Sequence, residues 1–75
     1  MSRIDRSTSP QTIREARKAL ALTQQQLGEY LGMQEQTIWR YEQLGAPRWM
    51  SLALVGLAVR MGRDPEEVVR ERSDE

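Results

Sequence analysis

The sequence has 75 residues, enough for one domain with a small hydrophobic core. It contains no cysteine and no histidine, which excludes disulfide bonds, thiolate or imidazole metal ligands and histidine-based catalysis. We therefore expect no metal, no other cofactor, no small-molecule ligand and no enzymatic activity. Apolar runs fall short of the roughly 20 residues of a membrane span, and the first ten residues lack the apolar segment of a signal peptide. We expect a cytoplasmic protein with no membrane partner.

The charged residues balance, with eleven basic and eleven acidic side chains, whereas nucleic-acid-binding domains are usually basic. Their distribution is uneven, because residues 1–18 hold five basic and two acidic residues. Charge alone leaves a DNA-binding surface and an ordinary solvated surface equally open.

Residues 1–8 show no apolar periodicity and are expected to form a flexible basic arm. The folded domain is predicted to cover residues 9–72, followed by a disordered tail at 73–75. We expect one all-α domain, a compact bundle of four to five helices.

The first helix is predicted over residues 10–21. Ser9 and Pro10 are typical of an N-cap and of a first helical residue, where the missing N–H of proline does no harm. Apolar residues then recur at helical spacing, at Ile13, Ala16 and Leu20.

A second helix is predicted to begin at Gln24, after Thr23, which as the N-cap has with Gln26 the pattern of a capping box. Gly32 ends this helix as a residue able to take a positive φ. Its buried stripe is predicted to consist of Leu27, Tyr30 and Leu31.

A third helix is predicted over residues 35–43, after only Met33 and Gln34, with Ile38 and Tyr41 directed inward. Two short helices joined by a turn with a glycine inside it are typical of a helix-turn-helix. Gly28 would allow the two helices to approach closely, although a tolerated surface glycine is the alternative.

A fourth helix is predicted over residues 48–61, after the loop that contains Gly45 and Pro47. Asp64 and Pro65 begin a fifth over residues 65–71, with acidic residues in its first turn. No strand is expected.

The sequence resembles the Cro and phage-repressor family of helix-turn-helix regulators over about residues 10–61. The resemblance rests on Arg17, Leu22-Thr23-Gln24, Leu27, Leu31-Gly32-Met33, Thr37-Ile38 and Tyr41-Glu42. It implies a central helix-turn-helix that binds double-stranded DNA in the major groove. It also implies a structural salt bridge between Arg17 and Glu42.

The outer face of the third helix carries Glu35, Gln36, Trp39 and Arg40, which share one side. Gln36 can pair with adenine and Arg40 with guanine, Glu35 can accept from cytosine, and Trp39 can contact a thymine methyl group. The resemblance implies base reading from these positions. A solvated helix face is the alternative, and Trp39 could instead close the core or touch a partner.

Phosphate contacts are expected from the residues around this helix. The resemblance implies that Gln24 binds a phosphate and braces the first residue of the recognition helix, and that an arginine such as Arg48 lies along the DNA backbone. Helix N-termini favour anions in any case. The candidates are Thr23, Gln24, Arg14, Lys18 and Arg48, with Arg3 and Arg6 of the arm as generic additions.

The fourth helix is apolar on all sides, which indicates that both of its faces are covered. We predict a symmetric homodimer that would place two recognition helices about 34 Å apart, to match a palindromic operator. The alternative is that the fifth helix folds back and completes a monomeric core. The predicted interface residues are Leu52, Val55, Val59 and Val68.

These features favour a sequence-specific regulator, in the simplest case a repressor or autorepressor of a phage or mobile-element operon. Compact autorepressors associated with anti-CRISPR operons are a similar group. The alternative is an antitoxin or protein-interaction adaptor that uses the helix-turn-helix as a scaffold.

Overall fold

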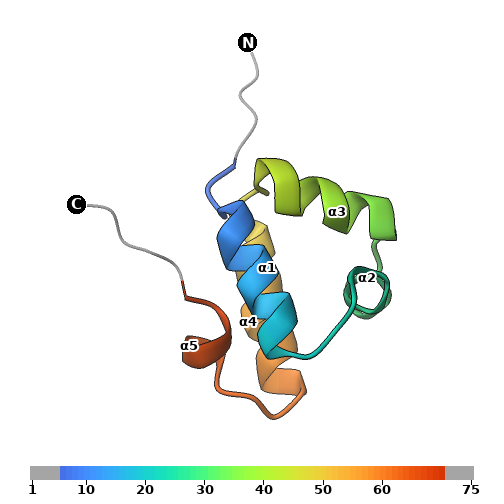
Figure 1. Cartoon of the computed structure of the whole chain (residues 1–75). Coiled ribbons are helices and arrows are strands. Elements are labelled where there is room, and N and C mark those ends of the chain that lie inside the picture. Colours follow the sequence, from blue (N-terminus) through green and yellow to red (C-terminus); the bar gives the residue numbers. More distant parts are fainter. Residues whose placement is uncertain (1–5, 71–75) are drawn as a thin grey trace, which may run out of the picture.

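A computed structural model describes residues 6–70. Its helices are α1 (Pro10–Ala19), α2 (Gln24–Leu31), α3 (Glu35–Leu44), α4 (Trp49–Arg60) and α5 (Pro65–Val68). In Figure 1, α1 lies in front of α4, α2 and α3 lie to one side, and α5 lies at the other. The predicted all-α class and helix-turn-helix bundle are confirmed. None of the helices in this part of the chain has the length and apolar character needed to cross a bilayer.

The predicted helix starts are confirmed by their caps. The Ser9 hydroxyl accepts from the backbone N–H of Thr12 at 3.1 Å. Thr23 and Gln26 form the reciprocal capping box, with both hydrogen bonds at 3.0 Å. Asp64 accepts from the backbone N–H of Glu66 at 3.0 Å. Each cap satisfies a backbone donor that the helix itself leaves unpaired.

The helix ends differ from the predicted ones by a few residues. α1 stops at Ala19 because Ala21 takes a positive φ of 60° and turns the chain towards α2. α5 stops at Val68, since Val69 is extended, and residue 71 lies outside the described residues.

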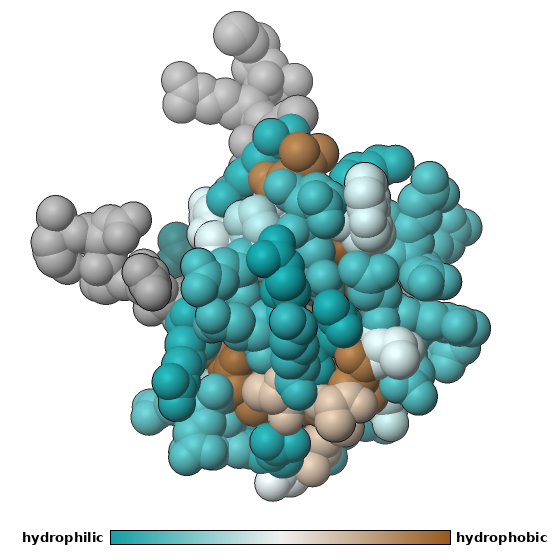
Figure 2. Space-filling view, in the orientation of Figure 1, coloured by the Kyte–Doolittle hydropathy of each residue, from teal (hydrophilic) through white to brown (hydrophobic). Residues whose placement is uncertain are grey.

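The core gathers one face of every helix, and the face drawn in Figure 2 is mostly hydrophilic. Tyr30 was predicted to be buried, but 56% of it is exposed. The inward side of α2 is centred between Leu27, Gly28 and Leu31, and at about 100° per residue Tyr30 falls on its flank. The buried hydrophobic residues are Ile13, Ala16, Leu20, Leu27, Ile38, Ala46, Met50, Leu54, Leu57, Ala58 and Val68.

The one β-type contact among the described residues joins Thr8 to Ala46. The N–H of Thr8 donates to the Ala46 carbonyl at 3.0 Å, and the N–H of Ala46 donates to the Thr8 carbonyl at 2.9 Å. Thr8 was predicted to be part of the flexible arm, but it is buried against the α3–α4 loop. Residues 1–5 and the predicted tail at 73–75 lie outside the described residues.

Candidate nucleic-acid interface

The turn between α2 and α3 has the predicted left-handed residue. Gly32 takes φ 72° and ψ 31° and caps α2, and the N–H of Met33 donates to the Gly28 carbonyl at 2.7 Å. Gln34 is the N-cap of α3, which begins at Glu35. The chain therefore turns within three residues, and α3, seen from the side in Figure 1, crosses the direction of α2, which is seen end-on.

Gly28 of α2 is buried against the turn that leads into α3. A Cβ at this position would overlap the Met33 carbonyl oxygen. The predicted close packing is thus present, and the neighbour is the backbone of the turn that leads into α3. A side chain at residue 28 would push that turn away from α2.

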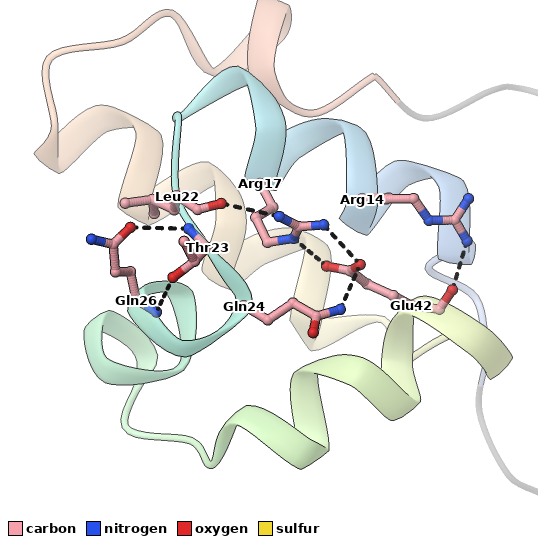
Figure 3. Close-up of polar contacts among 7 residues, drawn as sticks. All are labelled: Arg14, Arg17, Leu22, Thr23, Gln24, Gln26 and Glu42. Atoms are coloured by element: carbon pink, nitrogen blue, oxygen red, sulfur yellow. Dashed lines mark hydrogen bonds and ion pairs between the residues drawn. The ribbon is translucent and has the colours of Figure 1, made fainter.

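Three donors converge on the carboxylate of Glu42, which is 2% exposed (Figure 3). The Arg17 guanidinium donates from Nε to Oε2 at 2.6 Å and from Nη2 to Oε1 at 3.1 Å. The Gln24 amide nitrogen also donates to Oε1, at 3.1 Å. These contacts join α1, α2 and α3, and Arg17 also donates from Nη1 to the Leu22 carbonyl.

Two candidate phosphate-binding residues belong to this network. Arg14 donates from Nη2 to the backbone carbonyl of Glu42 at 2.7 Å, in the last turn of α3, where a cation is favourable. Gln24 was expected to brace the first residue of α3, but its amide nitrogen is directed to Glu42 near the other end. In the structure both side chains fix the position of α3.

The outer face of α3 is uncovered. Glu35, Gln36, Trp39 and Arg40 are all exposed, and Trp39, at 52%, does not close the core. Gln43 is exposed as well. It follows Trp39 by four positions and Arg40 by three, so it extends the same face. The sequence analysis missed it, although this spacing could have identified it.

The inner face of α3 packs through Ile38, which is fully buried, and through Tyr41, which is half-buried. The Tyr41 ring meets the Trp49 ring edge-on, with centroids 6.2 Å apart and planes at 74°. This contact ties the C-terminal half of α3 to the start of α4. The outer face of α3 is therefore held in a fixed position by the packing of its inner face.

The other candidate phosphate-binding residues lie at helix ends. Thr23 caps α2, Lys18 is exposed in the last turn of α1, and Arg48 is exposed directly before α4. Within residues 6–70, no three acidic side chains are grouped in a way that would hold a metal ion.

The predicted dimer residues fall into two groups. Leu52 and Val59 are 67% and 60% exposed on α4, and Val55 is half-buried beside them. Val68 is 2% exposed, because α5 folds back against α1 and α4. Val68 thus completes the core of its own chain, which was the alternative expectation, and it offers no surface to a partner.

Comparison with known proteins supports the geometry. Residues 13–47 match a family model described as Helix-turn-helix, a stretch that runs from the middle of α1 to the loop after α3. Neither the comparison with curated proteins nor that with solved structures gave a match. The capped α2, the left-handed turn and the uncovered α3 all lie within the matched residues, and over this stretch the chain is similar to the helix-turn-helix family of DNA-binding regulators.

Proposed function

We propose that the protein is a transcriptional repressor that binds a palindromic operator as a homodimer and reads it with α3. The observation that carries this proposal is the uncovered polar face of α3. The opposite side of this helix is fixed by the buried Glu42 carboxylate, which accepts hydrogen bonds from Arg17 and Gln24. Gln36 and Arg40 are the principal base-reading residues, and Glu35 and Trp39 complete the face. These side chains are of the types that pair with adenine, guanine and cytosine or pack against thymine in the major groove.

Repression is the simplest outcome of binding, because a protein that occupies a promoter needs no further domain to block transcription. The described residues contain the helix-turn-helix and the helices that support it. Such a compact regulator fits a phage or mobile-element operon, including those that carry anti-CRISPR genes, and autorepression places its operator upstream of its own gene.

Homodimer formation is supported by the apolar surface of α4. Leu52 and Val59 are the most exposed of the large hydrophobic residues within 6–70, and with Val55 they follow one helical stripe. Apolar side chains grouped in this way mark an interaction surface. A two-fold axis beside α4 would present two copies of α3 to the same side of a duplex.

The proposal is tested by titrating the DNA upstream of the gene, and a shuffled duplex, at several salt concentrations. We expect preference for the upstream DNA. Gln36→Ala and Arg40→Ala should each weaken that binding by about 1–3 kcal/mol and leave the shuffled duplex unaffected. Lys18→Ala is the control, because loss of a phosphate contact lowers both affinities. Equal affinity of the wild type for both duplexes would reject the proposal.

A second candidate is an antitoxin or adaptor, which Trp39 and Trp49 favour because about half of each is exposed, at 52% and 49%. Tryptophan is enriched in protein interfaces. Co-purification of a stoichiometric protein partner, lost in Trp39→Ala and accompanied by no protection of DNA, would support this candidate over the repressor.

A further inference from the structure

Residues 6–8 form a short strap that lies against the loop between α3 and α4. The Thr8–Ala46 backbone pair holds its end, and the Thr8 hydroxyl donates to the Pro47 carbonyl at 3.0 Å. Thr8 is 1% exposed. Thr8 thus donates two hydrogen bonds and accepts one, and together they fix where residues 6–8 meet the folded domain.

The strap passes directly over Gly45, the residue that ends α3. A Cβ built on Gly45 would lie 3.3 Å from the Cβ of Arg6 and 3.2 Å from the Thr8 carbonyl oxygen. Gly45 also has a positive φ of 94°, which side chains other than hydrogen rarely adopt. The Cβ of Arg6 therefore lies beside the C-terminal end of α3, and the residue is exposed.

We propose that Arg6 binds a DNA phosphate beside the C-terminal end of α3, and that the strap positions it there. This inference rests on the proposed insertion of α3 into the major groove. The walls of that groove are phosphate backbones, and an exposed guanidinium at the end of the inserted helix reaches one of them. The C-terminal end of a helix also attracts a cation, so a positive charge is favoured at this place.

The first experiment measures how the affinity for the upstream duplex depends on salt. One phosphate contact contributes about 0.9 to the slope of log affinity against log salt concentration. We expect Arg6→Ala to lower the slope by about that amount and to weaken binding about threefold or more. Arg6→Lys should keep the slope. The control is Arg63→Ala, an exposed arginine between α4 and α5. Figure 1 shows the segment that joins these two helices at the end of the molecule opposite to α3.

The second experiment tests the strap. Thr8→Pro removes the N–H that donates to Ala46 and the hydroxyl that donates to Pro47. The effect of Arg6→Ala should shrink at least twofold in this background, with far-UV circular dichroism used to verify that the variants are folded. If the effects of Arg6→Ala and Thr8→Pro on affinity are additive, the strap does not position Arg6.

The outcomes separate this inference from the proposed function. A wild type with the expected preference for upstream DNA, together with an Arg6→Ala variant whose slope equals that of the wild type or of Arg63→Ala, overturns the inference alone. A wild type with no preference between duplexes rejects the proposed function, whereas the slope measured on any duplex still tests the Arg6 contact.

Discussion

The buried carboxylate of Glu42 holds three helices of this small domain together. Removing a carboxylate from water is costly, and the cost is offset here by charge-assisted hydrogen bonds from Arg17 and a further one from Gln24. Each partner comes from a different helix, so the charge fixes the positions of α1, α2 and α3 relative to one another. Such a pair specifies geometry more than it adds stability.

Glu42→Gln tests this role, because it keeps the shape of the side chain and removes its charge. We expect a loss of about 3 kcal/mol in the free energy of unfolding, the lower end of the range for breaking a buried pair, because the Arg17 side chain is 17% exposed and retains some water. Urea unfolding followed by circular dichroism measures it. Glu15→Gln, the same change at an exposed residue, should stay within about 0.5 kcal/mol. Equal midpoints for the two variants would contradict the prediction.

Residues that act locally could be predicted from the sequence. Thr23 and Gln26 are three positions apart, and their capping box needs only the local helix. The contact of Arg14 with the Glu42 carbonyl spans 28 positions, and that of Thr8 with Pro47 spans 39. Such contacts depend on how the helices cross, and no local pattern carries that information.

The helices, too, were predicted well where local hydrogen bonds define them and less well where tertiary contacts do. Helix starts were predicted well because serine, threonine, aspartate and proline mark them through local hydrogen bonds. The end of α1 was missed because Ala21, which takes the positive φ, is a residue that favours helices. The uncovered face of α3 followed from its period, whereas the burial of Val68 depended on the direction in which α5 turns back.

The two glycines within helices have opposite expected effects when replaced. Gly28→Ala should destabilise the domain by about 1–3 kcal/mol, because its Cβ overlaps the backbone of the α2–α3 turn. Gly56→Ala should stabilise it by up to about 1 kcal/mol, because the new Cβ would meet no heavy atom within 4 Å apart from its chain neighbours and the backbone of α4 itself, and alanine favours the helix. Thermal unfolding at a concentration that keeps the chain monomeric checks both signs, and a stabilising Gly28→Ala would refute the packing argument.

At the scale of the whole molecule, the dimer proposal joins the apolar stripe on α4 to the spacing of the operator. Leu52→Gln combined with Val59→Gln should yield a monomer in sedimentation experiments, because it removes the two most exposed hydrophobic side chains of the stripe. Tyr30→Gln, which changes a similarly exposed side chain on α2, should leave the oligomeric state unchanged. A monomeric wild type would end the dimer proposal and leave the assignment of α3 to the groove intact.

A change in the spacing of the two operator half-sites tests the same dimer geometry independently. A rigid dimer places its two recognition helices about 34 Å apart, one turn of the duplex. Five base pairs inserted at the centre of the operator would turn the second half-site to the opposite side of the DNA. Because the link between half-sites then no longer contributes, the affinity of the wild type should fall about 100-fold or more, towards that of a single half-site. The Leu52→Gln, Val59→Gln variant should bind the original and the lengthened operators equally. A wild type that tolerates the insertion would show that each chain binds alone, whatever its oligomeric state in solution.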